Sequence, residues 1–247
     1  MLLQLATWPE VEAYLATSRS VILPIGSTEQ HGPNGMIGTD ALTADAIAKG
    51  VGDATGALVA PVIAVGMAQH HMAFAGSMTL RPSTLIAVVR DCVVSLARHG
   101  FERFFFINGH GGNIATVTAA FSEIYAEASL GAAGNRAGLK CVLRNWWENA
   151  AVRGLSKELY GNAEGGHATP SEVSVTWFLH PDAAKPMTLD PPIAPHGGAF
   201  GDAHDYRRRF PDGRIGSNPG LSSVDAGKRI FNAAVEALTA DYRAFAA

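Results

Sequence analysis

The chain has 247 residues, of which 47% are hydrophobic, and its 19 Lys plus Arg stand against 22 Asp plus Glu for a formal net charge of -3. This length is sufficient for one domain around a single core, which we expect to comprise residues 1–247. The near balance of charges and the lack of a basic block argue against nucleic acid and anionic membranes as partners and favour a small molecule. Cys92 and Cys141 lie in apolar segments and are expected to be buried thiols of a reducing compartment, which favours a cytoplasmic protein.

The first 18 residues predict a surface helix and not a signal peptide, because they have no basic n-region. Thr7 and Glu10 have capping-box spacing, with Pro9 in the first turn. Residues 54–80 carry no Asp, Glu, Lys or Arg, yet Pro61 and several Gly, Gln and His residues interrupt any run of about 20 apolar residues. We therefore expect a buried strand and a polar loop there, with no membrane span.

Apolar runs typical of buried strands recur along the chain, at residues 20–26, 57–66, 103–109 and 139–147. Segments with the apolar spacing of amphipathic helices separate these runs. The alternation predicts a parallel sheet with helices packed on both of its faces. Residues 186–219 are rich in Gly, Pro, Asp and His, which predicts a long ordered loop before a last helix from Ser222 towards Phe245.

Polar side chains follow the first three of these runs. The three segments are Glu29-Gln30-His31, Gln69-His70-His71 and Asn108-Gly109-His110-Gly111-Gly112-Asn113. In an open parallel sheet, ligands bind beyond the carboxyl ends of the strands. The sequence therefore predicts that the three loops meet at one functional site.

Glu29 and His31 are two residues apart, so in an extended backbone both side chains point the same way. A carboxylate and an imidazole placed together can bind one or two divalent ions. Asp40 lies nine residues beyond His31, at a predicted helix start that favours its charged form. A turn histidine and an ordinary first-turn acid are the alternative interpretations, since such spacings also arise by chance.

His110 favours the metal interpretation, because its glycine neighbours let the backbone pass close to a ligand and leave the imidazole as the reactive group of the turn. A dinucleotide-binding loop is the rival interpretation. That motif needs a third glycine at its sixth position, and counted from Gly109 the sixth residue is Ile114. Dinucleotide binding is therefore disfavoured.

Three motifs together resemble a known family: E-x-H at residues 29–31 with Asp40 eleven residues after the Glu, N-G-H-G-G-N at 108–113, and G-G-H-A-T-P-S-E at 165–172. They are similar to motifs of the creatininase family of metal-dependent amidohydrolases, and the resemblance covers nearly the whole chain. It implies a three-layer α/β/α sandwich with a mostly parallel central sheet in a single domain. It also implies a site for two divalent metal ions and a homo-oligomer, commonly a hexamer.

The resemblance implies a role for each matching ligand. Glu29 and His110 would bind one metal ion and His31 the other, with Asp40 bridging the two. Ligand sets of carboxylates and imidazoles suit zinc, which we favour, and also manganese or iron.

Two further histidines match positions of the family. His167 is implied to lie near the substrate and its leaving nitrogen, so we expect it to bind substrate and act as a catalytic proton shuttle. His71 matches a histidine of the family's second-strand loop and is expected to contact the substrate.

One ligand of creatininase itself is missing here, because that enzyme carries a metal-binding glutamate where this chain has Gly112. We expect Glu172 to serve as the replacement ligand and to be part of the catalytic site. The alternative is that Thr169 and Glu172 only form a capping box around Pro170.

The implied reaction is hydrolysis, by a metal-activated water, of a C–N amide bond that is not a peptide bond, in a cyclic amide or formamide. The departure at Gly112 leaves the substrate open. A mycofactocin-type peptidase of the same family and a non-catalytic small-molecule binder with this fold are the alternatives.

Overall fold

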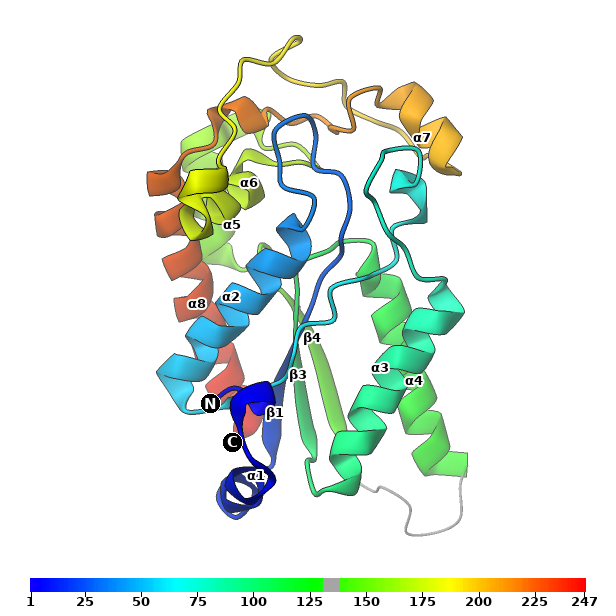
Figure 1. The fold of residues 1–247 in the computed structure, drawn as a ribbon, viewed down its shortest axis with the longest axis vertical. Coiled ribbons are helices and arrows are strands. Elements are labelled where there is room, and N and C mark those ends of the chain that lie inside the picture. Colours follow the sequence, from blue (N-terminus) through cyan, green and yellow to red (C-terminus); the bar gives the residue numbers. More distant parts are fainter. Residues whose placement is uncertain (131–137) are drawn as a thin grey trace.

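A four-stranded parallel sheet forms the centre of the molecule, with strand order β2-β1-β3-β4 (Figure 1). The computed structural model describes residues 1–130 and 138–247. The strands are β1 (Ser20–Ile25), β2 (Leu58–Val59), β3 (Arg103–Asn108) and β4 (Lys140–Asn145). Ser20 of β1 lies opposite Arg103 of β3, and the pairing continues to Ile25 opposite Asn108. The predicted parallel sheet is therefore confirmed.

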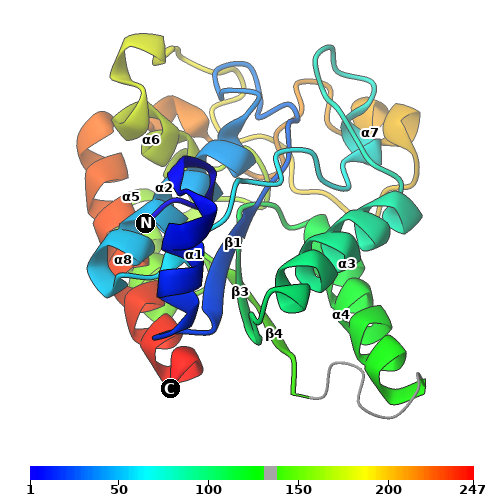
Figure 2. The ribbon, with the colours of Figure 1, turned by 60° about the horizontal axis from the view of Figure 1, so that its bottom comes forward.

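Helices cover both faces of this sheet, which gives the three-layer α/β/α sandwich that was expected (Figures 1 and 2). One face carries α2, α5, α6 and α8, and the other carries α3 and α4. The bounds are α2 (Thr39–Thr55), α3 (Pro82–Arg98), α4 (Asn113–Leu130), α5 (Ala150–Tyr160), α6 (Pro170–Leu179) and α8 (Val224–Ala246).

Alternate strand residues feed two separate hydrophobic cores. Ile22 and Phe105 point to the core beneath α2 and α8, whereas Leu23 and Phe106 point to the core beneath α3 and α4. All six residues of β1 are buried. Burial on both faces explains why the sequence of β1 is a continuous apolar run and does not alternate with polar residues.

The N-terminal helix forms as predicted and is α1 (Trp8–Leu15). The backbone N–H of Thr7 donates to the Glu10 carboxylate at 2.6 Å, which is the reciprocal half of a capping box. Among the residues that the structure describes, no helix has the length and apolar character needed to cross a membrane.

Two sequence predictions need correction. The strand predicted at 57–66 is far shorter, because only Leu58–Val59 forms a ladder and Ile63 then makes a single bridge to Ile25. Pro61 has no N–H and interrupts the pairing. The segment 186–219 is not all loop, since it contains helix α7 (Ala203–Arg209), whose start is capped by the Asp202 side chain.

The two cysteines are unpaired and only partly buried. Burial raises the pKa of the Cys141 thiol to about 12, and burial also raises the pKa of Cys92. Both side chains are therefore neutral thiols near neutral pH and are not reactive nucleophiles.

Candidate metal centre and active site

The loops beyond the carboxyl ends of β1 and β3 and the first turn of α2 meet above the sheet. They bring together Glu29, His31, Asp40 and His110, which are all buried although each is ionisable. Gly26 and Gly109 allow this approach, because a Cβ at either position would lie within 2.5 Å of the Asp40 backbone. The convergence predicted from the strand ends is thus present in the fold.

These side chains, together with Glu172 and His167, form three groups of three that could each hold a metal ion; one is Glu29, His31 and His167, and the other two share Asp40. The two groups that share Asp40 are Glu29, Asp40 and His110, and His31, Asp40 and Glu172; in each, the candidate ligand atoms lie within 4.8 Å of one another. Its Oδ1 lies 3.0 Å from Nε2 of His31, and its Oδ2 lies 3.1 Å from Nδ1 of His110. The two oxygens of one carboxylate therefore face two different histidines.

Protons supply the positive charge that these buried carboxylates require. Burial lowers the pKa of His31, but the carboxylates of Asp40, Glu172 and Glu29 together outweigh burial and raise it to about 10. For His110, Glu29 and Asp40 likewise outweigh burial and raise the pKa to about 9. Burial raises the pKa of Glu29 to about 7. A bound metal cation that displaced the protons of His31 and His110 would balance the negative charge of the same carboxylates.

Several atoms of the cluster also lack ordinary hydrogen bonds. Within the described residues, Glu29 Oε1, Asp40 Oδ2 and His71 Nε2 are buried without a hydrogen-bond partner. Nevertheless, His71 Nε2 lies only 3.1 Å from Glu29 Oε1. A buried carboxylate oxygen without a hydrogen-bond donor is costly, and a bound cation would compensate Glu29 Oε1 and Asp40 Oδ2. Oxygen and nitrogen ligands without thiolate fit zinc, manganese or iron.

The backbone at Gly112 explains why a ligand is missing there. A Cβ at this position would lie 2.3 Å from Nε2 of His110 and 2.6 Å from the carbonyl oxygen of Met67. That carbonyl lies 3.0 Å from the same nitrogen of His110. The present placement of the His110 ring therefore leaves no room for a side chain at residue 112.

The position of Glu172 is consistent with both interpretations of its motif, the helix cap and the replacement metal ligand. The backbone N–H of Thr169 donates to Glu172 Oε1 at 2.6 Å, and the Glu172 N–H donates to the Thr169 hydroxyl at 3.3 Å, so a capping box starts α6. The same Oε1 is 3.9 Å from Nε2 of His31. The capping contacts use Oε1, and Glu172 remains within reach of the cluster.

His167 lies beside the metal candidates and lines the cavity described below, with its ring centroid 4.8 Å from that of His31. Its Nε2 lies 2.9 Å from the backbone carbonyl oxygen of Gln30, which can only accept a hydrogen bond. The same Nε2 also lies 2.9 Å from the side-chain nitrogen of Gln30, which can only donate, so the two contacts favour opposite tautomers of His167. Burial, followed by His71 and His31, lowers the pKa of His167 well below its usual value, which favours the neutral ring.

Sequence reasoning did not single out Gln30 as a functional residue. Its side-chain nitrogen lies 2.9 Å from both His71 Nδ1 and His167 Nε2, and it donates to the carbonyl oxygen of Gly213 at 3.0 Å. His71 in turn contacts Glu29 and does not line the cavity. The structure thus places His71 behind the cluster, where it can orient Glu29.

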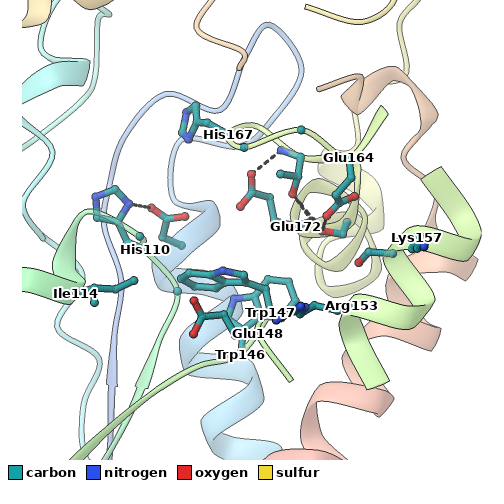
Figure 3. Close-up of a pocket in the computed structure, with 18 of the residues that line it drawn as sticks. His110, Ile114, Trp146, Trp147, Glu148, Arg153, Lys157, Glu164, His167 and Glu172 are labelled. Carbon is teal, nitrogen blue, oxygen red and sulfur yellow. Dashed lines mark hydrogen bonds and ion pairs between the residues drawn. The ribbon is translucent and has the colours of Figure 1, made fainter. Parts of the chain in front are cut away.

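A cavity of about 550 Å³ opens beside the cluster (Figure 3). Asp40, His110 and Glu172 form part of its wall, and Trp146 and Trp147 line it from the end of β4. Aromatic residues at a strand end are more often part of a core, so the sequence alone did not assign these tryptophans to the site.

Glu164 is a second residue of this wall that the sequence did not reveal. Its carboxylate accepts a short hydrogen bond from the Ser171 hydroxyl, while its other oxygen is buried without a partner among the described residues. Burial raises the pKa of Glu164 to about 7. The folded protein therefore binds a proton at Glu164 in a pH range where the unfolded chain releases it.

Glu164→Gln should therefore stabilise the protein at alkaline pH. Between its unfolded pKa near 4.5 and its folded pKa of about 7, Glu164 lowers the free energy of unfolding as pH rises. We expect the variant to gain about 1–3 kcal/mol at about pH 8 and little at about pH 4. Denaturant unfolding at both pH values measures the difference. Exposed Glu148→Gln is the control, and an equal gain in that variant would contradict the burial argument.

Comparisons with known proteins agree with this fold and cluster. A family model described as "Creatininase: Creatinine amidohydrolase" matches residues 4–241. Creatinine amidohydrolase of Pseudomonas putida is 31% identical over 186 residues, covering 71% of this chain and 70% of the relative. The mycofactocin precursor peptide peptidase of Mycobacterium ulcerans (strain Agy99) is 30% identical over 242 residues, covering 92% of this chain and 81% of the relative.

Solved structures agree as well. A structure described as "Creatininase Mn" has a TM-score of 0.83 at 26% identity, covering 98% of this chain and 97% of that chain. A mutant creatininase described as "Zn-Zn type" has a TM-score of 0.83 at 25% identity, covering 98% of this chain and 96% of that chain. The match over almost all of its length shows that this chain belongs to the creatininase family.

Proposed function

We propose that this protein is a metal-dependent amidohydrolase that hydrolyses a C–N amide bond of a small molecule. The observation that carries the proposal is the pair of buried ligand groups that share Asp40 and border a cavity. Its membership of a hydrolytic family supports the same reaction class.

Glu29, His110 and Asp40 would hold one divalent ion, and His31, Asp40 and Glu172 the other. We favour zinc, with manganese or iron as alternatives, and the zinc and manganese forms among the similar structures support this choice. When bound, two such ions lower the pKa of water and polarise an amide carbonyl.

The surrounding residues bind the substrate and move protons. His167 would accept a proton and deliver it to the leaving nitrogen, because its neutral ring lines the cavity beside the ligand cluster. His71 would orient Glu29 through the contact at 3.1 Å and would not bind substrate directly. Trp146 and Trp147 would pack against the substrate in the cavity.

We favour a cyclic amide or a formamide as substrate, since a cavity of about 550 Å³ is the size of a small-molecule site. The alternative is a peptidase, because one relative is named as a mycofactocin precursor peptide peptidase. A non-catalytic binder is disfavoured, because Asp40 and Glu172 are retained beside His31 and His110 at the wall of an open cavity. Assembly into a homohexamer stays a prediction from the family resemblance.

A hydrolysis screen of metal-loaded protein tests this function. Protein reconstituted with zinc, manganese or iron(II) would be incubated with creatinine, formylated aminopyrimidines, lactams and short peptides, with a chelated sample as control. We expect metal-dependent release of amine from a cyclic amide or formamide. Cleavage of peptides alone would favour the peptidase, and substrate binding without turnover would favour the non-catalytic binder.

A further inference from the structure

We propose that the substrate carries an oxyanion, a carboxylate or a phosphate, which binds Arg153 and Lys157 on the cavity wall formed by α5. The proposal rests on the function above, because it assumes that the cavity beside the ligand cluster is the substrate site. The oxyanion site would determine which amide substrate binds and would take no part in cleavage of the C–N bond.

Arg153 and Lys157 line the same cavity as His110 and Glu172. They are four residues apart on one helix, so both side chains emerge from the same face of α5. Figure 3 shows them on the α5 side of the cavity, across the tryptophans from His110. A single ligand in the cavity can therefore meet both cations.

Neither cation has an ion pair or a side-chain hydrogen bond with any residue that the structure describes. Two other arginines near α5 and α8 are paired, since Arg229 contacts Glu158 and Arg144 contacts Asp241. Among the described residues, Glu148 and Glu164 of the cavity wall form no ion pair with either cation and contact other residues. Glu148 accepts a hydrogen bond from Asn145, and Glu164 accepts one from Ser171. The two cations of α5 are thus available to a ligand.

The cavity is consequently polarised along its length. His110 and Glu172 of the proposed metal centre lie on one side of the tryptophans and the two cations of α5 on the other, while Glu148 and Glu164 also line the cavity. An amide held at the metal centre and ending in an oxyanion would complement both ends. Guanidinium and ammonium groups bind carboxylate and phosphate by charge-assisted hydrogen bonds. A neutral amide would gain no charge-assisted hydrogen bond from either cation.

Equilibrium binding to the zinc-loaded protein tests the proposal without relying on turnover. The probes are three sulfonamides that present no amide bond for hydrolysis: N-methylsulfonylglycine, N-methylsulfonylethanolamine phosphate and uncharged N-methylsulfonylethanolamine. Isothermal titration calorimetry should show that at least one anion binds about tenfold or more tightly than the neutral probe. The tighter of the two anions distinguishes a carboxylate from a phosphate.

The variant Arg153→Gln/Lys157→Gln should reduce this preference to about twofold or less. Both residues are exposed, so the fold should be retained, and circular dichroism checks this. Lys140→Gln is the matched control, because Lys140 is an exposed cation at the other end of the sheet. Equal binding of all three probes would overturn the proposal. So would an anion preference that survives in the double variant or falls equally in the control.

The outcome is separate from that of the hydrolysis screen. An anion preference that depends on α5, combined with no hydrolysis of any amide, would remove the proposed activity and keep the oxyanion site. Hydrolysis of amides together with equal binding of the three probes would keep the activity and remove the site.

Discussion

Asp40→Asn is expected to lose both metal ions and all measurable hydrolysis, whereas Glu172→Gln loses one ion. The difference follows from geometry, because Asp40 belongs to both ligand groups and Glu172 to one. Asparagine keeps the shape of aspartate but lacks the second anionic oxygen that a bridge requires. Inductively coupled plasma mass spectrometry of desalted protein measures the metal content of each variant.

Glu164→Gln is the control for this comparison, since it removes a carboxyl group from the cavity wall outside both ligand groups. This variant should retain two ions per chain. Retention of one ion in Asp40→Asn would show that Asp40 does not bridge. Two ions and full hydrolysis in Glu172→Gln would leave Glu172 as a helix cap only, because glutamine still serves a capping box.

His167→Ala should keep both metal ions but lower kcat by roughly 10²-fold or more, the usual scale for a positioned proton donor. The ring lines the cavity, and its Nε2 contact with Gln30 holds it in place. Added imidazole should restore part of the lost rate, which a merely structural role would not allow.

The control is His204→Ala, because His204 lies on α7 and is exposed. It should change neither metal content nor kcat. His167 also falls in a third possible ligand group with Glu29 and His31. Loss of metal from His167→Ala would therefore identify it as a ligand and contradict its assignment as a proton shuttle.

Much of the fold could be predicted because burial on both faces of a parallel sheet leaves a plain signal, as in the continuous apolar sequence of β1. The extent of β2 could not be predicted. Its apolar residues continue alongside β1 after Val59, but Pro61 interrupts the ladder of hydrogen bonds. Helix α7 was missed because it is only seven residues long and lies in a Gly- and Pro-rich segment. Its buried Tyr206 packs against residues distant in sequence.

The ligand cluster could be anticipated because its members follow strand ends, and the parallel topology brings those ends together. The supporting residues could not be. Gln30 acquires its role from contacts with His71, His167 and Gly213, which lie 41 to 183 residues away in the chain. In the sequence, Arg153 and Lys157 resemble the charged residues of any exposed helix face. Only the fold places them on the wall of the cavity beside the cluster.

Anomalous diffraction from crystals of the zinc-loaded protein tests the shared carboxylate most directly. Data collected on either side of the zinc absorption edge locate each ion without reference to activity. We predict two peaks, one bounded by Glu29 and His110 and the other by His31 and Glu172, with Asp40 between them. A single peak, or two peaks of which one lies out of reach of Asp40, would contradict a two-metal centre built on that residue.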